Sequence, residues 1–420
     1  MEKNILPKNK AIIIFLVFAF GYFLSCLLRA VTATLSPVLS SEFNLNAGDL
    51  GLLAGGYFLG FATMQIPLGY LLDNYGPKKI VSAFLLIAII GTLSFAVAQN
   101  FSGLLISRVL IGIGVSACLM GPLTGYRIWF KDKYQQRSNS WMLMVASLGF
   151  VFSTLPVQIL LPFFGWRYIF FTIAGLIVIC IFLLFIFLPN WKNQNSTKIT
   201  NKSGNLSEVW SNKFFQSTIP LGLFNYGGIM AIQTLWAGPW MVRVTGYTPL
   251  ESATGLFWIN VTMLIAFLIW GYLLPKISSS VKDAVKLIKL GLPISYIILF
   301  ILIILGEKAG VFLITFYILT SIVLSLAQPA VAMKFPTNLA GKSLTSFNLL
   351  IFVGTFIVQW SIGLLIDISR NYGFDEVKSF QISFMVYLLI CILSYSYFVF
   401  RNKFNICFKQ NCYSFRNFFY

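Results

Sequence analysis

Two arginines lie in stretches where the sequence is otherwise apolar, and they are the residues of this chain best placed to do chemistry. Arg29 falls slightly past the middle of one long apolar run, and Arg108 lies within another. A charged side chain at the centre of a lipid-embedded helix costs roughly 2.5 to 3.5 kcal/mol on insertion scales, so each is a candidate for function. A guanidinium can hold a carboxylate through two parallel hydrogen bonds. The sequence therefore predicts a site for a negatively charged group. A structural role, holding helices together, is the alternative for both arginines.

The residues around Arg29 repeat with the period of a helix. Tyr22, Ser25, Arg29, Thr32 and Ser36 follow one another at spacings of three and four residues, which places all five on one helical face. Lipid would leave such a polar face unsatisfied. We therefore expect this face to line water or a substrate, with Tyr22, Ser25 and Arg29 among the binding residues.

Neutral polar and aromatic residues supply the other candidate substrate contacts. They are Tyr57 and Tyr126 in the second and fourth apolar runs, and Asn225, Tyr226, Gln233, Trp236, Asn348 and Gln359 farther along the chain. Those of the seventh run, together with Trp240, are predicted to share one broad helical face. Hydrogen bonding between helices is the alternative for each neutral residue. Anchoring at the lipid–water interface is the alternative for Trp236 and Trp240.

The acidic residues are informative because none falls near the middle of an apolar run. They are Glu2, Glu42, Asp49, Asp73, Asp132, Glu208, Glu251, Asp283, Glu307, Asp367, Asp375 and Glu376, and the chain contains no histidine. A proton-coupled carrier normally uses an embedded carboxylate whose pKa is raised by burial. If the chain carries a solute, three options stay open for what drives the movement: proton coupling through Asp49, Asp73 or Asp367 at the ends of runs, an H⁺ or Na⁺ that accompanies the substrate, and passive transport.

Composition places the chain in a lipid bilayer. Of its 420 residues, 58% are hydrophobic and 10% are charged, and the formal net charge is +18. Such a charge on one exposed face would suggest a nucleic-acid partner. Here the basic residues lie in the gaps between apolar runs, as in membrane proteins, so we expect no nucleic acid. The six cysteines form neither a disulfide framework nor a zinc spacing. We expect no metal and no cofactor.

Twelve apolar runs are long enough to cross a bilayer, which takes about 20 residues. They cover residues 12–38, 48–72, 80–99, 102–126, 140–163, 168–189, 215–238, 250–275, 285–305, 310–333, 343–367 and 378–400. With the N-terminus inside, the outer side would hold few basic residues, namely Arg167, Arg243, Lys308, Arg370 and Lys378. The sequence therefore predicts a multi-pass protein of the cell inner membrane with both termini cytoplasmic.

The runs divide into two groups of six. A long polar stretch separates them, so we expect an N-terminal half (1–189), a cytoplasmic linker (190–213), a C-terminal half (214–400) and a cytoplasmic tail (401–420). Gly69-Tyr70-Leu71-Leu72 at the end of the second run recurs as Gly271-Tyr272-Leu273-Leu274 at the end of the eighth, which is the pattern of a parallel internal repeat. The tail alternates basic and aromatic residues, which predicts either contact with the inner leaflet or disorder.

The turn between the second and third runs resembles a motif of the major facilitator superfamily of transporters. Gly69, Leu71, Asp73, Gly76, Lys78 and Lys79 match its Gly-x-Leu-x-Asp-x-x-Gly-x-[Arg/Lys]-[Arg/Lys] pattern in order. The resemblance implies an all-α polytopic membrane protein of twelve transmembrane helices, arranged as two pseudo-symmetric six-helix bundles. We interpret Asp73, Lys78 and Lys79 as a cytoplasmic gate, with Arg127 as a local partner of Asp73.

Further residues are similar to marks of the same family. Arg108 with Gly112 and Gly114 resembles its Arg-x-x-x-Gly-x-Gly motif, and Arg108 is therefore a candidate for coupling as well as for structure. A first-helix arginine is also a feature of the organic-anion branch of the superfamily, although Leu28 stands where that branch has an aspartate before the arginine. Gly149 and Pro156 match the antiporter motif of the fifth helix poorly, which speaks against drug/proton antiport.

These observations predict a transporter, not an enzyme. We expect a monomer that moves a small, carboxylate-bearing metabolite by alternating access, either as a secondary active or as a facilitative carrier. Carriers of amino acids or other zwitterionic or neutral nutrients are the first alternative, with Arg29 holding only the carboxylate end. A multidrug/proton antiporter is a less favoured alternative. An enzyme would need a nucleophile with its base or a metal cluster, and neither pattern is present in the sequence.

Overall fold

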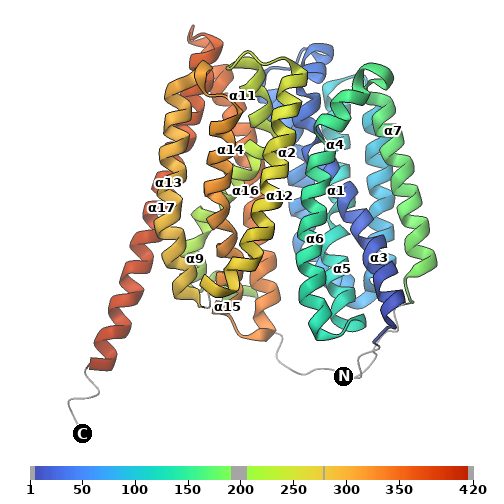
Figure 1. Cartoon of the computed structure of the whole chain (residues 1–420), viewed down its shortest axis with the longest axis vertical. Helices are drawn as coiled ribbons and strands as arrows, with labels where there is room; N and C mark the ends of the chain where they lie inside the picture. Colours follow the sequence, from blue (N-terminus) through green and yellow to red (C-terminus); the bar gives the residue numbers. More distant parts are fainter. Residues whose placement is uncertain (1–4, 191–205, 278–279, 415–420) are drawn as a thin grey trace.

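The computed structural model describes residues 5–190, 206–277 and 280–414, which form helices joined by short turns (Figure 1). The first half contains α1 (Lys8–Phe43), α2 (Ala47–Thr63), α3 (Gln65–Val97), α4 (Phe101–Val115), α5 (Ala117–Trp129), α6 (Asp132–Phe152) and α7 (Leu155–Phe187). Most of the expected linker, 191–205, and the end of the tail, 415–420, lie outside the described residues.

The second half begins with the short α8 (Leu206–Trp210), which packs on α16. It continues with α9 (Lys213–Pro220), η1 (Leu221–Tyr226), α10 (Gly227–Ala231), η2 (Ile232–Trp236), α11 (Ala237–Arg243), α12 (Pro249–Ile277), α13 (Val281–Leu305), η3 (Gly306–Lys308), α14 (Val311–Thr320), η4 (Ser321–Leu326), α15 (Ala327–Lys334), α16 (Thr337–Asn371) and α17 (Glu376–Ser414). The segments η1 and η2 are π-helical, and η3 and η4 are 3₁₀-helical. The last helix continues to Ser414, past the expected boundary at residue 400.

The helices account for the twelve predicted spans. Nine helical stretches of the described residues are each long and apolar enough to cross a membrane. Two of them, α3 and α7, turn at an internal glycine and so contribute to two spans each. Gly76 (φ 77°, ψ 161°) and Gly165 (φ 71°, ψ 161°) adopt backbone conformations that residues with a Cβ atom rarely reach. The seventh span is the continuous series from α9 to α11, divided by its π-helical turns.

Each half has its own hydrophobic core, and the surface away from it is apolar. Phe170, Ile111 and Phe58 are fully buried among residues of the first half, and Phe347, Leu235 and Phe384 are buried within the second. Large apolar side chains such as Phe163, Phe182, Phe312 and Leu393 are more than half exposed. This is the arrangement expected of a bundle whose outer surface contacts lipid. The chain is a multi-pass membrane protein.

Matching ion pairs tie the first and last spans of each half together. In the first half, Glu42 near the end of α1 meets Arg167 at the start of the sixth span, with 2.6 Å between Oε1 and Nη1. In the second half, Arg243 at the end of α11 meets Glu376 at the start of α17, with 3.8 Å between Nη1 and Oε1. The two pairs occupy corresponding places with their charges exchanged. They agree with the internal repeat suggested by the sequence.

The two halves lie side by side, and α1 begins and α17 ends at the same end of the bundle (Figure 1). We call this end the terminal side and the opposite end the far side. Contacts between the halves run along α2 with α16, α1 with η2 and α11, and α6 and α7 with α12. Gly51 of α2 lies directly against the backbone of Gln359 in α16, where a Cβ atom would collide with the carbonyl oxygen. Close backbone packing therefore holds the halves together on the far side.

Candidate functional site

Arg29 lies on the face of α1 that is turned toward the second half. Its side chain is only 5% exposed. The guanidinium carbon lies 5.2 Å from the ring centroid of Phe61 and 5.4 Å from that of Phe352, which belongs to α16. Its Nε donates a long hydrogen bond of 3.5 Å to the hydroxyl of Tyr57. No carboxylate of the described residues forms an ion pair with it, and its two terminal nitrogens make no hydrogen bond there. The guanidinium is thus buried, and no described acid balances its charge.

Tyr57 is held in place by the first helix. Its hydroxyl donates to the backbone carbonyl of Ser25 at 3.1 Å and lies 3.4 Å from the Ser25 hydroxyl oxygen. The structure therefore brings together Ser25, Arg29 and Tyr57, three of the predicted site residues. Tyr22, one helical turn before Ser25, is also buried in the first half.

Arg108 is the second buried cation, and it is fully inaccessible. Its Nη1 donates to the backbone carbonyl of Leu28 at 2.9 Å, and its guanidinium carbon lies 5.4 Å from the centroid of the Tyr57 ring. Its Nε and Nη2 have no hydrogen-bond partner in the part of the chain that the structure describes. Gly112 explains the position physically, because the absence of a side chain lets α4 pack against the backbone of Tyr57.

The candidates of the seventh span point in different directions and do not share one face. Asn225 donates to Ser394 Oγ at 3.0 Å and accepts from the hydroxyl of Tyr296 at 2.6 Å, inside the second half. Gln233 donates to Asn260 of α12 at 3.0 Å. Tyr226 is half-buried and packs against the core of the second half.

The cause of this difference from the sequence-based expectation is local. The π-helical turns η1 and η2 carry more residues per turn than an α-helix. A projection with the α-helical period therefore assigns the wrong directions to the side chains that follow them. Trp236 and Trp240 are both buried, so they are not anchors at the lipid–water interface.

Gln359 of α16 lies where three helices meet. Its backbone carbonyl accepts from Trp236 Nε1 at 3.1 Å, its side-chain amide donates to Thr234 Oγ1 at 3.0 Å, and Gly51 of the first half packs against its backbone. Asn348, three helical turns earlier, accepts from Gln328 Nε2 at 2.5 Å. Both residues thus bond to neighbouring helices. These are the helix-to-helix hydrogen bonds that the sequence left open as the alternative.

Tyr126 belongs to the packing of the first half. Its ring stacks on Phe130 with 4.6 Å between centroids, and its hydroxyl lies 3.6 Å from the sulfur of Met142 in α6. These contacts do not bring it to Arg29. Its aromatic neighbours Phe15 and Phe18 come from α1.

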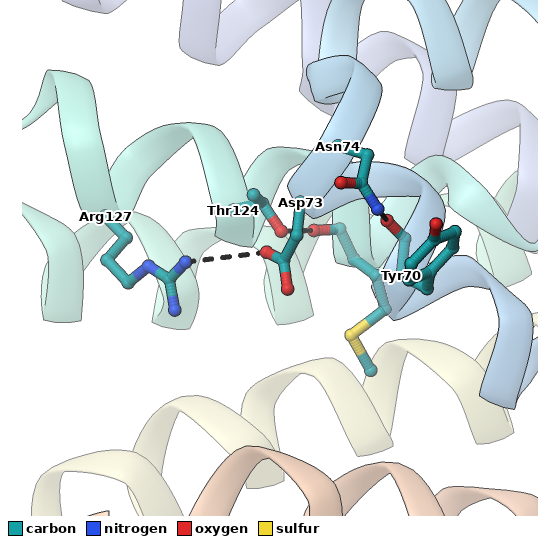
Figure 2. Close-up of polar contacts among 6 residues, drawn as sticks. Tyr70, Asp73, Asn74, Thr124 and Arg127 are labelled. Atoms are coloured by element: carbon teal, nitrogen blue, oxygen red, sulfur yellow. Dashed lines mark hydrogen bonds and ion pairs between the residues drawn. The ribbon is translucent and has the colours of Figure 1, made fainter. Parts of the chain in front are cut away.

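The expected gate residues lie on the terminal side. Arg127 reaches Asp73 with 3.7 Å between Nη2 and Oδ1 (Figure 2). The side chains of Arg127 and Asp73 are 70% and 69% exposed. Beside them, Asn74 turns back to the carbonyl of Tyr70. Asp73 is thus paired within its own half in this conformation.

The two lysines of the motif have different surroundings. Lys78 donates to the backbone carbonyl of Leu188 at 2.9 Å and to Asn190 Oδ1 at 3.3 Å. It therefore caps the carboxyl end of α7, where a cation is favoured by the helix dipole. Lys79 is exposed.

Asp367 is a functional candidate whose partner the sequence did not reveal. Its carboxylate accepts hydrogen bonds from the backbone N–H groups of Ala47 at 3.1 Å and Gly48 at 2.6 Å, so it caps α2 from the opposite half. The sequence offers an acid at the end of the eleventh span and a helix N-terminus after the first, which Asn46 and Asp49 cap locally, but nothing in it pairs the acid with that terminus. Within the described residues, no group of three potential ligands could hold a metal ion.

The fold consists of two helical bundles, with buried cations near their junction and polar contacts at both ends. The chain belongs to the Major Facilitator Superfamily, whose family model matches residues 18–359. This confirms the family and the twelve-helix fold that the sequence predicts.

Two named relatives illustrate the similarity. The chain is 25% identical over 276 residues to the probable anion transporter 6, chloroplastic, of Arabidopsis thaliana. The aligned part covers 62% of this chain and 50% of that protein. The chain is 24% identical over 188 residues to the probable L-galactonate transporter of Escherichia coli (strain K12), which covers 44% and 40%. Further bacterial relatives, one of them named for multidrug resistance, align over 35% to 38% of their own length.

Solved structures share the fold along nearly the whole chain. A bacterial homolog of the human lysosomal transporter Spinster, in an inward-facing and unoccupied conformation, matches with a TM-score of 0.75 and 16% identity. The match covers 95% of this chain and 98% of that one.

Proposed function

We propose that the chain carries a small, carboxylate-bearing metabolite across the cell inner membrane by alternating access, with Arg29 as the residue that holds the carboxylate. The observation that carries the proposal is the state of Arg29: its guanidinium is buried near the junction of the halves and lacks an acidic partner among the described residues. An uncompensated charge in such surroundings is costly, and an anionic solute would compensate it.

The geometry around Arg29 fits a carboxylate. Nε is engaged with Tyr57, so the guanidinium is oriented, while the terminal nitrogens can form the paired hydrogen bonds that arginine makes with carboxylates. Tyr57 and Ser25 add hydroxyl groups beside it. The named anion and L-galactonate relatives are consistent with a solute of this class.

We further propose that the terminal side is cytoplasmic. Lys78, Lys79, Arg127 and Lys131 lie on this side, as the positive-inside rule requires. Close packing of α2 on α16 closes the far side, so this conformation would receive solute from the cytoplasm, like the inward-facing Spinster homolog.

The proposal places no proton carrier in the middle of the bundle. Carboxylates that form ion pairs or hydrogen bonds in the described residues, including Glu42, Asp73 and Asp367, lie near helix ends. Coupling to H⁺ or Na⁺ would therefore run through the solute itself or through the acids at the ends of the spans. Measuring uptake with and without each ion gradient separates these cases from facilitated diffusion.

The test is to remove the guanidinium. A thermal-shift panel of metabolites on the purified protein identifies a ligand, and its uptake is then followed in proteoliposomes. We expect Arg29→Gln to reduce uptake at least tenfold, because a hydrogen bond to a charged group contributes about 1.5–3 kcal/mol. Arg29→Lys should restore uptake only in part, since an ammonium cannot form the paired hydrogen bonds.

The matched control is Arg370→Gln, the same chemical change at an exposed position. Both variants must reach the membrane at wild-type levels and remain monodisperse. Wild-type uptake by Arg29→Gln would refute the proposal. Competition by simple carboxylates, but not by amines, separates an anion carrier from one for amino acids.

A further inference from the structure

We propose that the solute is a dianion, with Arg29 holding one negative group and Arg108 holding the second. This inference rests on the proposed function and narrows its substrate class. Dicarboxylates and sulfonated carboxylates have the required chemistry, since both present two acidic groups on a small frame. Arg108 would then be a specificity-determining residue.

The first observation is that Arg108 is incompletely satisfied. A fully buried guanidinium is ordinarily hydrogen-bonded through most of its nitrogens. Arg108 makes one hydrogen bond, from Nη1 to Leu28, while Nε and Nη2 have no partner among the described residues. An arginine that served only to hold helices together would be expected to use these donors on backbone carbonyls. Two unused donors point to an acceptor that arrives from outside.

The second observation is that the two arginines share their surroundings. The carbonyl that Arg108 binds belongs to Leu28, the residue next to Arg29. Both guanidinium carbons lie near the same aromatic ring, at 5.8 Å and 5.4 Å from the centroid of Tyr57. The two guanidinium groups therefore border the same aromatic side chain.

The third observation is the balance of charge. Neither Arg29 nor Arg108 forms an ion pair within the described parts of the chain, so two positive charges stand together in a weakly polar interior. Aromatic faces compensate such charges only in part. A monoanion would pair one cation and leave the other exposed to the full desolvation penalty, whereas a dianion pairs both.

The experiment compares matched solutes that differ by one charge. Dissociation constants are measured on the purified full-length protein for succinate and its monoamide succinamate, and for sulfoacetate and its amide. We expect the dianion of at least one pair to bind at least tenfold more tightly than its amide. Arg108→Gln should remove this preference, and Arg29→Gln should weaken both members of the pair.

Controls address folding and general charge effects. Arg370→Gln removes an exposed arginine and should retain the preference for the dianion. If Arg108→Gln is not monodisperse, Arg108→Met is used, which removes the charge and keeps an apolar side chain of similar length; it should likewise remove the preference.

The possible outcomes are distinguishable. Equal binding within the pairs, or a preference that survives Arg108→Gln, overturns the dianion assignment. Binding of the monoanions that still depends on Arg29 would then leave the proposed function standing. If no anion of the panel binds, or if binding ignores Arg29, both proposals fail together.

Discussion

The carboxylate of Asp367, near the end of α16, accepts a hydrogen bond from the backbone N–H of Gly48 at 2.6 Å. Ala47 donates to the same carboxylate at 3.1 Å. The first turn of α2 is therefore capped by an acid from the other half. Such a cap stabilises the helix only while the halves are together on the far side. We predict that this contact is part of a far-side gate, which a full transport cycle would break once and remake once.

Replacing Asp367 tests this gate. We expect Asp367→Asn to raise backbone hydrogen exchange across residues 46–51 and to increase the population that is open on the far side. The expected change is roughly ten- to a hundredfold, because hydrogen bonds to a charged acceptor contribute about 1.5–3 kcal/mol.

Asp375→Asn provides the matched control. That carboxylate accepts from the backbone N–H of Lys378 at 2.7 Å within the same half, and this hydrogen bond lowers the pKa of Asp375. Unchanged exchange in α2 of Asp367→Asn would show that the cap does not hold the gate.

The glycine contact of the same interface gives a second prediction. A Cβ atom at Gly51 would meet the backbone of Gln359, so Gly51→Ala should push α2 and α16 apart. Overpacking costs about 1–3 kcal/mol. Here the added methyl group destabilises only the state in which the far side is closed. We expect slower transport and a lower unfolding temperature.

Gly271→Ala serves as its control, because a Cβ atom at Gly271 has open space around it. An alanine in a helix interior is otherwise favourable. Equal effects of the two substitutions on transport would contradict the role of the Gly51 contact.

The pair of Asp73 and Arg127 predicts a separation between stability and transport. Both side chains are largely exposed, and exposed ion pairs contribute about 0–1 kcal/mol. We expect Asp73→Asn to leave the unfolding temperature nearly unchanged while it reduces transport several-fold, because we interpret Asp73 as a contact of the state that is closed on the terminal side.

The charge-exchanged double variant, Asp73→Arg with Arg127→Asp, examines the same idea. The double variant keeps an ion pair between the two positions but exchanges its charges, so position 73 presents a positive charge to the second half. Transport should remain low. Full recovery of transport would mean that the pair works only within its own half.

The neighbouring lysines give a prediction with an internal control. Lys78→Gln removes the cation that caps the end of α7. It should lower the unfolding temperature by about 1–3 °C, because such contacts contribute about 0.3–1 kcal/mol. Lys79→Gln, one residue away and exposed, should leave the unfolding temperature unchanged. A thermal unfolding curve of each variant decides the matter, and identical curves for the two would exclude the cap.

Much of the fold could be predicted because lipid imposes a simple rule on the sequence. A span needs a long apolar run, and runs of that length are legible without knowledge of their neighbours. Gly76 could be placed in a turn for a similar reason, since a charged segment with glycine and proline cannot continue a lipid-embedded helix. The structure gives Gly76 a positive φ angle at that position.

The candidate site was predictable only near Arg29. The spacing of Tyr22, Ser25 and Arg29 follows the α-helical period of α1, and the structure keeps that period. The seventh span departs from it at η1 and η2, so the directions of Asn225 and Gln233 could not be derived from spacing.

The sequence by itself determined that this chain crosses a membrane repeatedly, that it repeats in two halves, and that Arg29 and Arg108 lie where charge is expensive. These follow from composition and local periodicity, which are properties of single helices. Only the tertiary structure decided that Tyr57 stands beside both arginines, and that Asp367 caps α2 across the junction of the halves. The reason is that a side chain's partner depends on which helices are neighbours and how closely their backbones approach.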